Sequence, residues 1–348
     1  MTDSAIQPSP IPEFLRRADR VVLAIIALFA AIAIFLPEQL WPSTVFTAKN
    51  LLYISPFLIL SVTLAAWVKA TGLDGQIVKV FSGHVVTTIG VAALFGALSP
   101  FCSCGVVPLI AGLLAAGVPL APVMAFWIAS PIMDPQMFLI TAAVLGLPFA
   151  VVKTAAAVVM GLGAGFAIHA MGGTGILASP LREGVGVSSC SAPKSGGPRQ
   201  DPKVIWRFWG EAERRAMFGR EAKGTGWFLA RWLFLAFALE SLMVTYVPAD
   251  MVGSWLGGGN WWSIPMGVLV GIPAYLNGFA AVPTIDALLE LGMMPGAAMA
   301  FLVAGSVTSI PAAMAVFALV RLPLFGLYIG FGVIGALATG LAYQTIMF

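Results

Sequence analysis

The sequence predicts an all-α polytopic membrane protein built around an internal repeat. Of its 348 residues, 59% are apolar and only 9% are charged. Several apolar runs reach the roughly 20 residues that a helix needs to cross about 30 Å of hydrocarbon. Glycine and proline are frequent, with 38 and 24 copies, which favours helices that are interrupted within the membrane.

About nine apolar segments follow one another along the chain. They lie near 21–37, 50–70, 84–116, 120–146, 147–170, 226–247, 262–292, 296–320 and 323–346. Arg16, Arg17 and Arg20 precede the first segment, and no A-x-A cleavage site follows it. We therefore interpret this segment as a retained transmembrane helix rather than a cleaved signal peptide.

The chain changes character between residues 171 and 225. Residues 171–203 are rich in Gly, Ser and Pro and predict a flexible linker that carries Cys190 as a free thiol. From Val204 to Lys223, apolar residues recur at helical spacing among arginines. This pattern predicts a basic amphipathic helix on the cytoplasmic membrane surface, with a short solvated helix as the alternative.

Two halves of the chain match at one constant offset without a gap. Met124-Ala125-Phe126 corresponds to Met299-Ala300-Phe301, and Gly117 corresponds to Gly292. The same offset places segment 50–70 on 225–245. The predicted organisation is an N-terminal tail and extra helix (1–49), repeat 1 (50–170), a cytoplasmic linker with an amphipathic helix (171–225) and repeat 2 (226–348).

Positive charge predicts how the two repeats are oriented. Lys and Arg mark cytoplasmic loops, so the N-terminus and the basic loop 171–225 both belong inside. Each four-segment repeat then crosses the membrane an odd number of times, because one of its broken segments is re-entrant. The repeats are therefore inverted, an organisation typical of transporters that bind substrate near the bilayer midplane.

Two cysteines in Ser99-Pro100-Phe101-Cys102-Ser103-Cys104-Gly105 lie where a helix should break. Thiolates are soft ligands for thiophilic centres, and trivalent arsenic has the same softness. The N-terminus of a half-helix would favour the thiolate form. We predict a substrate site at Cys102, Ser103 and Cys104, while the alternative is that cysteine is simply small enough for a tight break.

The equivalent break in repeat 2 contains Tyr275 and Asn277, and without a gap Asn277 falls on Cys102. Asn277 is a candidate substrate ligand or a helix cap, and Tyr275 a candidate ligand or a packing aromatic. Prolines and glycines are predicted to form the breaks of both repeats. They are Pro100, Gly105, Pro108, Pro131, Pro135, Pro273, Gly278, Pro283 and Pro311.

A second break in each repeat carries further polar residues. Asp134 lies between Pro131 and Pro135, and an ionisable group in such a segment is a candidate for proton coupling or for an N-cap. Ser130, Thr308 and Ser309 are candidate substrate ligands, although for Thr308 and Ser309 a hydroxyl bonded within its own helix is an equal alternative. No zinc-site or P-loop spacing occurs, so we expect no metal, no cofactor and no ATP hydrolysis.

The chain resembles the ArsP-type family of predicted permeases. The resemblance rests on Ser99–Pro108, on Ala129-Ser130-Pro131, and in repeat 2 on Ala300-Phe301-Leu302 and Ser309-Ile310-Pro311, and it covers about residues 50–346. It implies a permease linked to the efflux of trivalent organoarsenicals. Some relatives carry a further cysteine where this chain has Asn277, so capture of arsenic by three thiols is not implied here.

The sequence thus predicts a secondary transporter of the bacterial inner membrane, not an enzyme, that exports trivalent arsenicals past the cysteine pair. Import of a sulfur compound such as thiosulfate is one alternative, and a membrane thiol oxidoreductase is another. The expected partners are a small-molecule or metalloid substrate and the lipid bilayer, with no nucleic acid. A homo-oligomer is a further candidate assembly.

Overall fold

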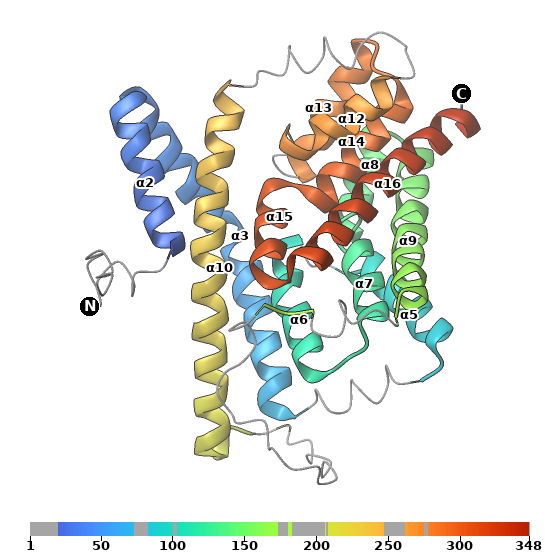
Figure 1. Ribbon diagram of the computed structural model, residues 1–348. Coiled ribbons are helices and arrows are strands. Elements are labelled where there is room, and N and C mark those ends of the chain that lie inside the picture. The colour runs from blue at the N-terminus through green and yellow to red at the C-terminus, as the bar shows by residue number, and fades with distance from the viewer. Residues whose placement is uncertain are drawn as a thin grey trace, which may run out of the picture.

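The computed structural model describes residues 20–72, 83–99, 103–172, 180–182, 206, 208–246, 262–274 and 278–347, and its regular structure there is helical apart from one isolated β-bridge. The helices of the first half are α2 (Arg20–Phe35), α3 (Pro37–Thr71), α5 (Val85–Ala97), α6 (Ser103–Ala116), α7 (Leu120–Ala129), α8 (Pro135–Val144) and α9 (Leu147–Ala170). Those of the second half are η2 (Phe208–Gly210), α10 (Ala212–Tyr246), α12 (Ser263–Ala274), α13 (Gly278–Glu290), α14 (Pro295–Thr308), α15 (Ile310–Leu319) and α16 (Leu322–Met347) (Figure 1).

Membrane spanning follows from helix length and apolar surface. Within the described residues, three stretches are long and apolar enough to cross a bilayer, namely Leu147–Ala170, Pro295–Leu319 and Leu322–Ile346, or four if the two halves of α3, bent by 46° after Pro56, count as one span. Large apolar side chains remain exposed, such as Val159 at 65% and Ile334 at 67%. A surface of this kind is suited to lipid, so the predicted class of polytopic α-helical membrane protein is confirmed.

Other apolar helices are too short to span the membrane alone. α7 and α8 have 10 residues each, and α5, α6, α12 and α13 have between 12 and 14. At 1.5 Å per residue, such helices cover about half of a 30 Å hydrocarbon layer. The predicted segments 84–116, 120–146 and 262–292 are therefore pairs of half-helices joined at breaks.

The helix boundaries agree with the offset that carries Met124 onto Met299 in the sequence. This offset carries the first residues of α3, α6, α7, α8 and α9 onto the first residues of α10, α13, α14, α15 and α16, respectively. Figure 1 shows α3 and α10 running in opposite directions, and α9 and α16 doing the same. Opposed directions of this kind are what an inverted repeat produces, and the inverted repeat itself stays a prediction.

Packing between helices follows the same correspondence. Within the halves, α7 packs between α5 and α9, and α14 packs between α12 and α16. Between the halves, α3 packs on α10, α9 on α16, α6 on α15 and α8 on α13. When the two halves are exchanged, the contacts of α3 with α10 and of α9 with α16 map onto themselves. The contact of α6 with α15 maps onto that of α13 with α8. A two-fold relation between the halves gives this pattern.

Two glycines allow close approach at equivalent places. A Cβ added at Gly96 would lie 2.7 Å from the carbonyl oxygen of Phe126, and a Cβ added at Gly271 would lie 2.7 Å from the carbonyl oxygen of Phe301. Small residues of this kind let membrane helices pack at short distances. The inner helix α14 is consequently enclosed, with residues 296–308 all buried.

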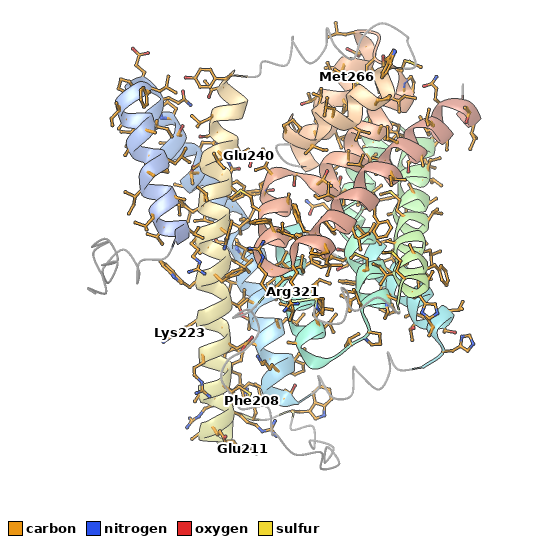
Figure 2. All side chains as sticks on the ribbon, viewed as in Figure 1. Phe208, Glu211, Lys223, Glu240, Met266 and Arg321 are labelled. Carbon is orange, nitrogen blue, oxygen red and sulfur yellow. The ribbon has the colours of Figure 1, made fainter. Side chains whose placement is uncertain are left out.

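The start of α10 differs from the sequence expectation. Residues 212–223 do not form a separate surface helix but begin the 35-residue helix α10. In Figure 2, Phe208, Glu211 and Lys223 lie toward one end of this helix and Glu240 toward the other. This end of α10 is held against α3, because Arg214 Nη1 donates to the Ala70 carbonyl at 2.7 Å and Lys69 Nζ contacts Glu221 Oε2 at 2.7 Å. These polar contacts explain why the basic segment forms part of a helix packed on α3 rather than a separate surface helix.

Replacing Gly271 by alanine should destabilise the protein. The new methyl group would meet the Phe301 backbone, which cannot rotate away, so we expect an overpacking cost of about 1–3 kcal/mol and a lower Tm in detergent. Gly90→Ala is the control, because a Cβ there meets nothing within 4 Å. Equal Tm values for the two variants would contradict the close packing of α12 on α14.

Candidate functional site

The first break of each half lies between two half-helices. In the first half α5 ends at Ala97 and α6 begins at Ser103, which places the backbone of Cys104 in the first turn of α6. Cys102, Tyr275 and Asn277 lie outside the described residues, as do the side chains of Ser103 and Cys104. The position of Cys104 is nevertheless the one in which a helix N-terminus stabilises a thiolate.

Several residues predicted to break helices lie inside them. Pro108 is within α6 and Pro283 within α13, Pro273 belongs to the last turn of α12, and the backbone of Gly105 is helical. Each interior proline removes only one backbone donor, so the helix continues past it. Gly278 is the first residue of α13, whereas Pro100 lies outside the described residues.

The second break of the first half lies between α7 and α8, at residues 130–134. Asp134 is the N-cap of α8, and its Oδ1 accepts a hydrogen bond from the Met137 backbone N–H at 2.8 Å. Pro135 follows as the first helical residue, where its missing N–H costs nothing. Ser130 is 1% exposed, and its hydroxyl has no hydrogen-bond partner among the described residues.

The corresponding break between α14 and α15 is uncharged. Thr308 is buried and donates its hydroxyl to the Ala304 carbonyl at 2.7 Å, so this group is bonded within its own helix. Ser309 is the N-cap of α15, with no side-chain hydrogen bond to the helix, and Pro311 follows in its first turn. Of the two hydroxyl ligands predicted at this break, Thr308 thus already donates its O–H to a backbone carbonyl.

Lys153 is a buried charge that sequence reasoning missed. It lies in α9, is 0% exposed, and its Nζ has no hydrogen-bond partner within the described part of the chain. Helix α8, whose N-cap is Asp134, packs against α9. The sequence did contain a sign of its importance, namely a lysine within an apolar, helix-forming run. Charged residues inside membrane segments are rare and line functional pathways.

In the second half, the equivalent of Lys153 is Tyr328. This tyrosine is also buried, donates its hydroxyl to the Val307 carbonyl at 2.8 Å, and packs its ring 5.2 Å from that of Trp127. The contact with Trp127 joins α16 to α7 across the two halves. The same position is therefore neutral and hydrogen-bonded in one half and charged in the other.

Glu240 is a second buried ionisable residue. It lies inside α10, before the helix ends at Tyr246, is 3% exposed, and its Oε2 has no hydrogen-bond partner among the described residues. The sequence pattern did not single out this glutamate. Glu240 is therefore a buried carboxylate of the second half, comparable in burial with Lys153.

Half-membrane helices, two matching halves and buried charges define a multi-pass membrane protein of the transport type. Residues 43–345 match the family ArsP_1, described as a predicted permease. The match extends over most of the chain, so the chain belongs to this permease family. The resemblance inferred from the cysteine and proline motifs is thereby confirmed.

Two named relatives support the same assignment. UPF0718 protein MJ0584 of Methanocaldococcus jannaschii is 23% identical over 301 residues, covering 73% of this chain and 82% of that protein. UPF0718 protein YcgR of Bacillus subtilis is 30% identical over 97 residues, which span only 33% of its length and 28% of this chain. No significant match to a solved structure was found.

The two roles of Asp134 can be separated by substitution. Asp134→Ala removes both the charge and the acceptor for the Met137 N–H, whereas Asp134→Ser removes only the charge, because serine also caps helices. We expect Asp134→Ala to be about 0.5–2 kcal/mol less stable than Asp134→Ser. Thermal unfolding of the purified protein measures the difference, and identical Tm values would show that the cap contributes nothing.

Proposed function

We propose that this permease exports trivalent arsenicals, with Cys102 and Cys104 as the thiol ligands. The observation that carries the proposal is the C-x-C pair in the sequence, whose second cysteine, Cys104, has its backbone in the first turn of α6. Membership of the permease family supports a transporter over an enzyme. The arsenical substrate is our inference from the softness of the thiol ligands.

The proposed chemistry is ligand exchange at arsenic(III). When methylarsenite binds, two As–S bonds form and two As–O bonds break, and the two thiol protons leave with the hydroxide groups as water. No electron is transferred, so no redox partner is required. The reverse exchange with water releases the arsenical on the other side of the membrane.

The helix breaks support binding inside the bundle rather than at its surface. A broken backbone is tolerated at membrane depth only where protein or a water-filled cavity covers it. Here α6 packs on α15 of the other half, and α8 packs on α13. A ligand bound at these breaks would lie between the two halves, which suits alternating exposure to the two sides.

The proposed location is the bacterial inner membrane. The N-terminus and the loop 171–225 are proposed to face the cytoplasm, because both carry clusters of arginine. With this orientation, export corresponds to uptake by everted membrane vesicles.

Transport into everted vesicles tests the substrate and the cysteines together. Methylarsenite, arsenite and thiosulfate are offered separately to vesicles with the wild-type chain, Cys102→Ser/Cys104→Ser or Cys190→Ser. We expect methylarsenite to accumulate with the wild-type chain and with Cys190→Ser, because Cys190 lies in the polar linker. The double variant should lose accumulation, since serine is not a soft ligand.

Three results would contradict the proposal. Arsenical uptake that survives Cys102→Ser/Cys104→Ser would remove the pair from the binding site. Equal loss with Cys190→Ser would indicate general thiol damage. Transport of thiosulfate alone would replace the arsenical by a sulfur anion.

A further inference from the structure

Lys153 carries a charge that the fold alone does not explain. Its side chain is 0% exposed in a helix long enough to span the membrane, and its Nζ has no hydrogen-bond partner in the described part of the chain. Its burial prevents the ammonium from reaching water in the way that long side chains near helix ends do. Such a charge is costly unless an opposite charge compensates for it.

The helices packed against α9 offer one charged partner. Helices α5, α7 and α14 contain no charged or titratable residue, and α16 contributes only Tyr328 and Tyr343. Tyr328 is bonded to the Val307 carbonyl, and Tyr343 packs its ring 5.2 Å from that of Phe149. Helix α8 packs on α9 and begins at the N-cap Asp134, which carries a carboxylate.

The two histidines of this region lie far from Lys153. His169 is in the last turn of α9, about 24 Å along the helix at 1.5 Å per residue. His84 is the N-cap of α5, and a Cβ added at Gly165 would lie 2.7 Å from the Ile89 side chain, so this end of α5 packs near the end of α9. Asp134, the N-cap of α8, is therefore the anionic residue that these helices offer, while α13, which packs on α8, carries Asp286 and Glu290.

The second half shows that this architecture does not need the two charges. Ser309 caps α15 where Asp134 caps α8, and Tyr328 occupies the place of Lys153 in α16. The helices concerned begin at matching residues, and the tyrosine satisfies its polar atom with a backbone carbonyl. The second half thus builds the equivalent hairpin with neutral residues at these two positions, so the fold itself does not require the charges there.

We propose that Asp134 and Lys153 form the proton-coupling pair of this permease. The proposal deepens the proposed function and rests on it, because it names what drives the export. Asp134 binds a proton from the outer side as an O–H bond forms at the carboxylate. Lys153 then loses its counter-charge, and the pair is restored when that proton is released to the cytoplasm.

This cycle gives Lys153 a role in positioning rather than in substrate binding. While Asp134 is ionised, its charge attracts the ammonium and holds the hairpin of α8 and α9 together. Once Asp134 is neutral, the buried ammonium is uncompensated, which favours a rearrangement of the hairpin. One proton moves inward for each cycle that moves substrate outward, so charge and atoms balance.

The coupling test uses the full chain reconstituted into liposomes that contain a pH-sensitive dye. Methylarsenite is the probe, and the variants are Lys153→Met, Asp134→Ser and, as the matched comparison, Glu240→Gln. We expect accumulation driven by a pH gradient to fall by about 5- to 150-fold in the first two variants, the range of typical coupling between two ligands. Methylarsenite exchange without a gradient should persist in both, and Glu240→Gln should keep proton movement that accompanies the substrate.

Gradient-driven accumulation that is unchanged in Lys153→Met, or lost only in Glu240→Gln, would overturn the pair. A substrate-independent measurement separates this failure from an error in the proposed substrate. Asp134→Ser should lower the Tm in the wild-type background, where it leaves Lys153 uncompensated, but have little effect in Lys153→Met. If no probe is transported, this dependence still supports the pair, whereas equal Tm losses in both backgrounds would overturn it.

Discussion

The absence of water in the bilayer core is the constraint on which the rest of the structure depends. Each end of a half-helix exposes backbone groups that lipid cannot bond, so protein must cover every break. The chain meets this requirement by pairing half-helices between halves, with α6 on α15 and α8 on α13. The enclosed helix α14 and the close contact at Gly271 bring the breaks into the interior. This arrangement is the reason that we propose a site at the breaks.

The two halves have the same framework but different chemistry. Matching helices begin at equivalent residues, yet one half carries Asp134 and Lys153 where the other carries Ser309 and Tyr328. The cysteine motif also belongs to the first half alone. The second half carries a buried carboxylate of its own at Glu240, so the two halves differ in where their charges lie.

Local pattern was sufficient for those features that the bilayer itself selects. Apolar runs gave the membrane class, and the constant offset between the repeats anticipated the helix starts that the structure later showed. The sequence pattern did not predict correctly where helices break or where a surface segment joins a packed helix. Pro108, Pro273 and Pro283 lie in helices because each removes only one backbone donor, and Gly105 keeps its own N–H. The basic stretch at residues 212–223 joins α10 because α3 offers partners for its charges.

The sequence by itself determined the class of protein, the family and the duplicated plan, because composition, motif and periodicity are properties of the chain. Only the tertiary structure decided which polar residues are already satisfied. Thr308 bonds within its own helix and Asp134 caps α8, whereas Lys153 and Glu240 are buried with unpaired atoms in the described part of the chain. The reason is physical: the cost of a charge depends on burial and on its neighbours, and both are fixed by contacts between segments distant in sequence.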